Sequence, residues 1–230
     1  METPHFFFLT ELVSRLGFEH FAHQFNHVIH SWFVMAILVL AAIIFTKGLT
    51  LVPHKGQNVF EAIVEGLENF LVDITGPEGR FLLPFIATLF LYIFLCNLIG
   101  LVPGFFSPTA NINTTLSMAI CTFIYTHIIG VKFHGIKYIK HFLGPVWWLA
   151  PLMLPIELIG HFARILSLSV RLFGNIFGKE MVLAILFVLA GLYLAPLPIL
   201  FLGILVSFIQ ALVFMLLSII YFVGAMEEAH

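Results

Sequence analysis

The 230-residue chain has few charged residues. Asp, Glu, Lys and Arg make up 10% of it, whereas 61% of its residues are hydrophobic and its mean hydropathy is +1.09. Soluble domains carry about 25% charged residues, so this composition excludes an ordinary soluble protein and indicates an integral membrane protein. The formal net charge of -2 shows no basic excess of the kind that favours nucleic-acid binding. We expect a single membrane domain over residues 1–230, embedded in a lipid bilayer.

Motifs of soluble catalysis are also missing. Residues 174–180 superficially resemble a phosphate-binding loop, but Glu180 stands where Ser or Thr is required, and no strand is expected before it. The sequence has no HExxH zinc motif and no Ser/His/Asp or Cys/His set suited to an aqueous pocket. Its two cysteines, Cys96 and Cys121, lie in apolar runs, and we interpret both as buried free thiols. We therefore expect no catalytic site within the chain and no cofactor.

Hydropathy and turn residues divide the chain into helical segments. After Pro155 no strong break occurs for about 40 residues, or about 60 Å of helix, twice the hydrocarbon thickness of a bilayer. Such a helix has to be strongly tilted. The expected fold is all-α, a polytopic membrane protein with about five membrane-embedded helices, the last two long and tilted. The expected segments are an outer N-terminal segment (1–30), a first span (31–47), an interfacial amphipathic helix (56–73), a helical hairpin (81–133) and a long tilted hairpin (146–223).

Four histidines near the N-terminus share a helical face: His20, His23, His27 and His30. Imidazole is a common zinc ligand, so a metal site is one interpretation. We favour an interfacial helix facing water, because the ligands of a zinc ion converge on a point whereas a straight stripe runs along the helix axis.

The distribution of Lys and Arg predicts the orientation. With five helices alternating in direction, one side of the membrane has only Arg15, and the other has Lys47, Lys55, Arg80, Lys132, Lys137 and Lys140. Because cytoplasmic loops are enriched in Lys and Arg, the N-terminus is expected outside and the C-terminus in the cytoplasm.

A polar stripe runs through the apolar segment 157–180. At about 3.6 residues per turn one helical face carries Glu157, His161, Arg164, Arg171 and Asn175. Gly174 and Gly178 lie four residues apart and leave a smooth patch that another helix backbone can approach. The polar stripe itself suits a buried ion path.

Arg171 is the sharpest feature of this stripe. An arginine at the bilayer centre costs about 2.5 to 3.5 kcal/mol and does not lose its charge. The carboxylates of Glu157 and Glu180 lie about 21 and 14 Å away along the helix axis, too far for pairing within the helix. Arg171 therefore needs a compensating group from elsewhere.

Three segments resemble a known family. SLSVRLFGNIFGKE (167–180), NTTLSMA (113–119) and QALVFM (210–215) are similar, in this order, to the signatures of subunit a of the F-type ATP synthase membrane sector. The resemblance implies a stator subunit that couples proton flow to rotation of a c-subunit ring and so drives ATP synthesis. It also implies b-type peripheral stalk subunits and the remaining synthase subunits as partners, in a bacterial inner membrane. The chain would be part of an enzyme complex without holding a catalytic site.

The same resemblance implies roles for single residues. Arg171 would face the ring carboxylate, with Gln210 and Asn175 close by. Two proton half-channels would be lined on the outer side by Glu180 and Asn113, and on the cytoplasmic side by Glu157, His161 and Ser167. Some family members have a histidine at Gly203 and an acid at Asn111, so the outer relay differs here.

Two other functions remain as alternatives. A self-contained secondary transporter or ion channel would use the stripe as its own path, and such proteins usually contain an internal repeat, which we do not see. In a purely structural scaffold Arg171 would be replaceable.

Overall fold

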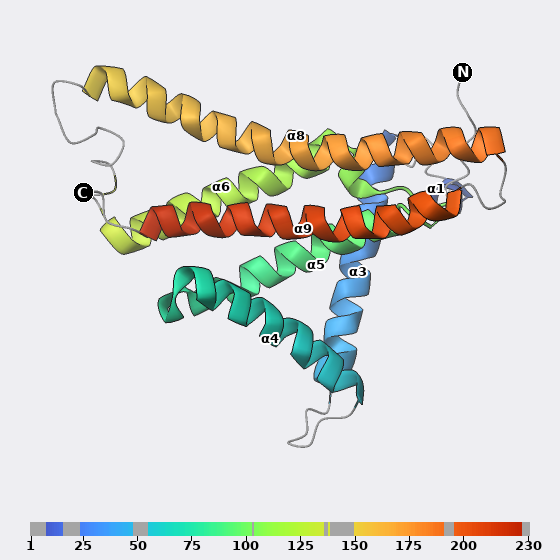
Figure 1. Ribbon diagram of the computed structural model, residues 1–230, viewed down its shortest axis with the longest axis horizontal. Helices are drawn as coiled ribbons and strands as arrows, with labels where there is room; N and C mark the ends of the chain where they lie inside the picture. The colour runs from blue at the N-terminus through green and yellow to red at the C-terminus, as the bar shows by residue number, and fades with distance from the viewer. Residues whose placement is uncertain are drawn as a thin grey trace.

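A computed structural model describes residues 8–15, 24–47, 55–102, 104–135, 138, 150–190 and 196–226. Over these residues all regular structure is helical and no strand is present (Figure 1). Four stretches are long and apolar enough to cross a membrane: Asn26–Thr46, Pro77–Ile99, Ile112–His134 and Pro198–Met226. The predicted all-α polytopic membrane fold is confirmed.

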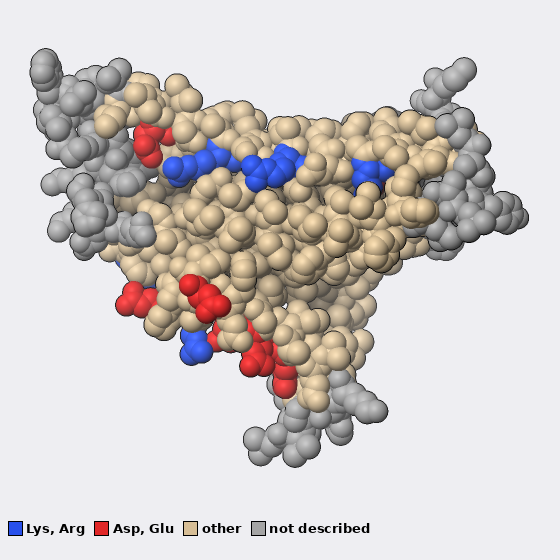
Figure 2. Space-filling model, in the orientation of Figure 1, with Lys and Arg blue, Asp and Glu red and all other residues tan. Residues whose placement is uncertain are grey.

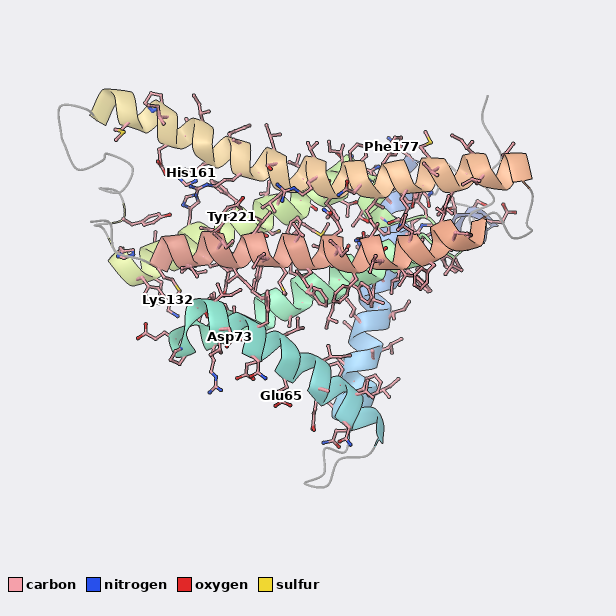
Figure 3. All side chains as sticks on the ribbon, in the orientation of Figure 1. Glu65, Asp73, Lys132, His161, Phe177 and Tyr221 are labelled. Atoms are coloured by element: carbon pink, nitrogen blue, oxygen red, sulfur yellow. The ribbon has the colours of Figure 1, made fainter. Side chains whose placement is uncertain are left out.

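The N-terminal half begins with the short helix α1 (Phe8–Arg15) and continues with α3 (Asn26–Thr46) and α4 (Lys55–Thr75). α3 is apolar after its first turns and runs across the long axis of the molecule (Figure 1). α4 is amphipathic: Leu67 and Leu71 are buried, whereas Glu65 and Asp73 are exposed (Figure 3). Its apolar face packs on the helices that follow.

A hairpin of two helices forms the middle of the molecule. The 3-10 helix η1 (Pro77–Leu82) leads into α5 (Leu83–Ile99), and η2 (Pro108–Ala110) precedes α6 (Ile112–His134). Asn111 caps α6, because its side chain accepts a hydrogen bond of 2.9 Å from the backbone N–H of Asn113. The turn from α5 to α6 therefore has a fixed geometry beside the second hairpin.

The two longest helices are α8 (Ala150–Ala190) and α9 (Pro196–Met226), which lie side by side along the long axis (Figure 1). The 41 residues of α8 correspond to about 60 Å of helix. α6 packs against both helices, and α5 packs against α9. The pair thus presents one face to the bundle and leaves the other open.

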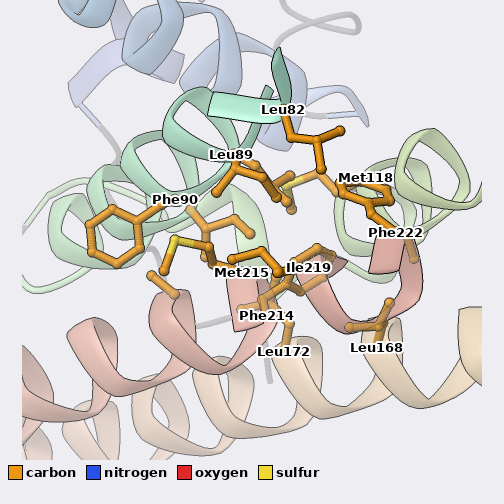
Figure 4. Close-up of a cluster of buried hydrophobic side chains, with 14 of the residues drawn as sticks. Leu82, Leu89, Phe90, Met118, Leu168, Leu172, Phe214, Met215, Ile219 and Phe222 are labelled. Carbon is orange, nitrogen blue, oxygen red and sulfur yellow. The ribbon is translucent and has the colours of Figure 1, made fainter. Parts of the chain in front are cut away.

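The apolar core lies where α5, α6, α8 and α9 meet (Figure 4). On α8, Leu168, Leu172 and Ile176 are four residues apart and buried, as one helical face requires. Phe214 and Phe222 of α9 meet them there. This packing fixes which face of α8 remains available for polar residues.

The cysteine prediction is half wrong. Cys96 is buried in α5, but Cys121 is exposed on α6, because it lies on the helix face that turns away from the other helices.

Candidate functional site

The polar stripe of α8 lies along its seam with α9. Figure 2 shows basic side chains spaced along this seam, and the Lys and Arg residues of α8 are Arg164, Arg171 and Lys179. Their helix has its apolar side in the core, so the stripe occupies the edge between the core and the open face. The residues in the middle of the stripe and those at its two ends contact different groups.

Arg171 lies in the middle of the stripe and is exposed. Its guanidinium donates one hydrogen bond, from Nη2 to Oγ of Ser167, over 3.3 Å. In the described part of the chain no carboxylate lies within ion-pair distance of Arg171. The charge is therefore directed at the open face with only a neutral hydroxyl beside it.

One turn further along α8, Asn175 joins the two long helices. Its Nδ2 donates a hydrogen bond of 2.7 Å to Oε1 of Gln210, which is buried on α9. Sequence separates the two amides by 35 positions. The structure thus places both residues next to the turn that carries Arg171.

Glu157 and His161 form the end of the stripe nearest the start of α8. Oε1 of Glu157 lies 3.5 Å from Nε2 of His161, and the imidazole points from α8 toward the other helices (Figure 3). The guanidinium of Arg164 stands 5.5 Å from the ring centroid of Tyr221 on α9. A pocket between α6, α8 and α9 is lined by His161, Arg164 and Tyr221 together with Thr122 and Thr126.

Lys179 and Glu180 form the other end of the stripe, nearest the C-terminal end of α8. Oε1 of Glu180 accepts a hydrogen bond of 3.1 Å from the backbone N–H of Ser107. Nζ of Lys179 donates to the backbone carbonyl of Asn97 at 3.1 Å and to Oγ of Ser207 at 3.2 Å. These bonds connect α8 to α5, α9 and the loop before α6.

The network continues through buried hydroxyl groups. Oγ of Ser107 donates to the carbonyl of Cys96 over 2.8 Å and lies 2.9 Å from Oγ1 of Thr109. Thr109 in turn donates to Oδ1 of Asn97 over 2.5 Å. Sequence reasoning missed Ser107, Thr109 and Lys179 as members of this end. Asn97 could have indicated this network, because it is a strongly polar residue in the interior of the apolar span that forms α5.

No hydrogen bond joins Asn113 to Glu180 among the described residues. Asn113 is exposed at the start of α6, and its backbone N–H bonds to the cap residue Asn111. Among the described residues the hydrogen bond to Glu180 comes from Ser107 instead. The loop before α6 brings its backbone to the carboxylate, so the side chain of Asn113 is not the group in contact.

Two glycines allow this close packing. A Cβ atom on Gly100 would lie 2.8 Å from Oε1 of Glu180 and 2.5 Å from Cβ of Ser107. On Gly203 it would lie 2.7 Å from Cδ2 of Leu101 and 3.4 Å from Cδ of Lys179. The Lys179 side chain therefore occupies the space beside Gly203, where some family members carry a histidine.

The N-terminal histidines do not converge within the described residues. His30 is buried, with Nδ1 3.0 Å from the carbonyl of Asn26, whereas His20 and His23 lie outside the described residues. In the ranges that the structure describes, no group of three or more His, Cys, Asp or Glu side chains is placed to hold a metal ion.

Comparison with known proteins matches the chain over almost its whole length. The family model described as ATP synthase A chain covers residues 28–223. ATP synthase subunit a of Desulfosudis oleivorans is 57% identical over 230 residues, covering 100% of both chains. ATP synthase subunit a of Syntrophobacter fumaroxidans is 59% identical over 204 residues, which is 89% of this chain and 85% of the relative. The chain therefore belongs to the ATP synthase A chain family.

Proposed function

We propose that this protein is the stator subunit of an F-type ATP synthase membrane sector, and that it couples transmembrane proton flow to rotation of a c-subunit ring. The observation that carries the proposal is the environment of Arg171. Its charge is directed at the open face, and among the described residues its hydrogen-bond partner is Ser167; polar networks lie at the two ends of the same helix. Family membership supports the assignment.

The two networks serve as half-paths on opposite sides of the membrane. Glu157, His161 and Ser167 border the cytoplasmic one, and Glu180 the outer one. Asn113 borders the opening of the outer half-path. Lys and Arg residues are in excess on one side of the predicted topology. This excess supports an orientation with the N-terminus outside and the C-terminus in the cytoplasm. Lys132 at the end of α6 lies 4.7 Å from the ring centroid of Phe81, next to Arg80, so these two cations share one end of the bundle.

The mechanism depends on a carboxylate of the ring. It has to be protonated to turn through lipid, because a bare charge there is costly. Arg171 stabilises the ionised form as the site arrives, so the proton leaves into one half-path and the next site reloads from the other. Because Arg171 stays charged, it repels protons that would otherwise pass between the half-paths. Each proton supplies about 2.3 kcal/mol per 100 mV of membrane potential.

The open face of α8 and α9 suits a neighbouring ring of helices. On α8, a Cβ atom on Gly174 or Gly178 would meet no atom of the described chain within 4 Å, so another backbone has room to approach. On α9, Phe201 and Leu205 are exposed and apolar.

The other proposed partners are b-type peripheral stalk subunits and the remaining synthase subunits. The proposed location is a bacterial inner membrane, in which residues 1–230 form one membrane domain.

The proposal is tested by measuring ATP-driven proton pumping in inverted membranes, with fluorescence quenching of an acridine dye as the readout. Arg171→Ala is expected to abolish coupled pumping. Arg171→Lys is expected to fail as well, because a compact ammonium lacks the planar guanidinium and can lose its proton when buried. Arg80→Ala is the matched control, since Arg80 pairs with Glu68 at the surface. Coupled pumping retained by Arg171→Ala refutes the proposal. Pumping by the isolated chain without a ring supports the transporter alternative instead.

A further inference from the structure

A second imidazole lies beside His161, at the end of the α8 stripe that borders the proposed cytoplasmic half-path. His127 of α6 has its ring centroid 5.1 Å from that of His161, and its Nδ1 lies 2.9 Å from the hydroxyl of Tyr138. Glu157 lies 3.5 Å from the far side of this pair, at Nε2 of His161. Four groups that can hold or pass a proton therefore follow one another from the connection after α6 to α8.

Tyr138 is held in this position by the shape of α6. The residue is buried, and its ring covers Gly130: a Cβ atom there would lie 2.2 Å from Cε2 of the tyrosine. Only a residue without a side chain lets an aromatic ring approach the helix so closely. Phe123 packs edge-on against both imidazoles, with centroid distances of 4.3 and 5.6 Å, and so limits their movement.

We propose that His127 and Tyr138 extend the inner half-path, passing protons between cytoplasmic water and His161. The inference rests on the proposed function and adds two residues to it. In each transfer a proton binds one nitrogen of the His127 ring while the proton on the other nitrogen leaves for His161, directly or through one water molecule. The His127 imidazole ends neutral in its other tautomer, and rotation of the ring or the reverse transfer resets it.

Charged groups lie beside the proposed proton path from cytoplasmic water to His161. Glu157 of α8 lies 3.5 Å from His161, and Arg164 of α8 and Tyr221 of α9 line the same pocket as His161, so one carboxylate and one fixed cation lie near this imidazole. Burial raises the pKa of the Tyr138 phenol, which therefore stays protonated at neutral pH. In a transfer the Tyr138 hydroxyl gives its proton to Nδ1 of His127 and takes another from water, and the two imidazoles carry the proton onward.

The test uses inverted membranes bearing the complete synthase, in which the cytoplasmic side faces the medium. His127→Ala and the milder His127→Gln are compared with Phe123→Leu, which alters the packing of the same two rings without removing an imidazole. Pumping is normalised to the amount of assembled complex and measured from pH 6 to 9, with and without added imidazole. The relay predicts that His127→Ala loses about tenfold or more of its pumping rate above pH 8, where protons are scarce, and that imidazole in the medium restores much of it. Phe123→Leu is expected to show no response to imidazole.

Two results overturn the inference. One is a pumping rate of His127→Ala and His127→Gln equal to that of the parent at every pH. The other is a loss that imidazole does not relieve and that Phe123→Leu reproduces. Arg171→Ala, measured in parallel, separates this failure from that of the proposed function: coupled pumping in Arg171→Ala refutes both, whereas its absence together with normal His127 variants refutes the relay alone.

Discussion

The hydrogen bond between Asn175 and Gln210 offers a quantitative test of how the arginine-bearing turn is held. Its length is 2.7 Å and it is partly buried, joining α8 to α9 next to Arg171. A neutral hydrogen bond contributes about 0.5 to 1.5 kcal/mol, which corresponds to about a 2- to 13-fold change in an equilibrium. If the bond keeps α8 in register for the ring, Asn175→Ala and Gln210→Ala should each slow ATP-driven pumping by about that factor.

The double variant decides whether the bond itself is responsible. Once one partner is gone the second has nothing left to contribute, so the double variant should pump about as slowly as either single variant. Independent contributions would instead multiply, to about a 4- to 170-fold loss. Exchanging the two residues, Asn175→Gln with Gln210→Asn, keeps donor, acceptor and combined length and should recover part of the rate. Multiplying losses, or an exchange as slow as the double alanine variant, would refute the reasoning.

Two further predictions follow from the same contacts. Gly203→Leu should reduce pumping severalfold, because even a Cβ atom there would lie 2.7 Å from Leu101 and 3.4 Å from the Lys179 side chain; parental pumping would contradict this packing. Arg80→Ala should change the thermal midpoint of the detergent-solubilised complex by no more than about 4 degrees, because Arg80 is exposed and surface pairs of this kind contribute about 0 to 1 kcal/mol.

Local sequence patterns predict the helices and the polar stripe well. The apolar runs of α3 and α9 and the spacing of Leu168, Leu172 and Ile176 depend on neighbours three or four positions away, which a sequence shows directly. The isolation of Arg171 from Glu157 and Glu180 follows from helix rise alone. The structure adds the hydroxyl of Ser167 as its one hydrogen-bond partner among the described residues.

Contacts between distant segments could not be predicted in this way. The carboxylate of Glu180 is met by a backbone N–H from 73 positions away, and a backbone donor leaves no mark on residue identity. Lys179 bonds to Asn97 across 82 positions. Its role is visible only once Gly203 is seen to leave space beside it. The same holds for His127, whose contact with His161 depends on how α6 packs against α8.

The stripe on α8 is continuous in sequence but its contacts are not. At its Glu157 end the stripe meets α6 and α9, and at its Glu180 end it meets α5, α9 and the loop before α6. Between them Arg171 contacts a hydroxyl of its own helix. A fixed charge inside a bilayer costs about 2.5 to 3.5 kcal/mol, and one neutral hydrogen bond of 3.3 Å does not offset that. Within the described residues no carboxylate compensates this charge, and the proposed ring, which would bring one carboxylate after another past Arg171, would meet the requirement while keeping the two polar ends apart.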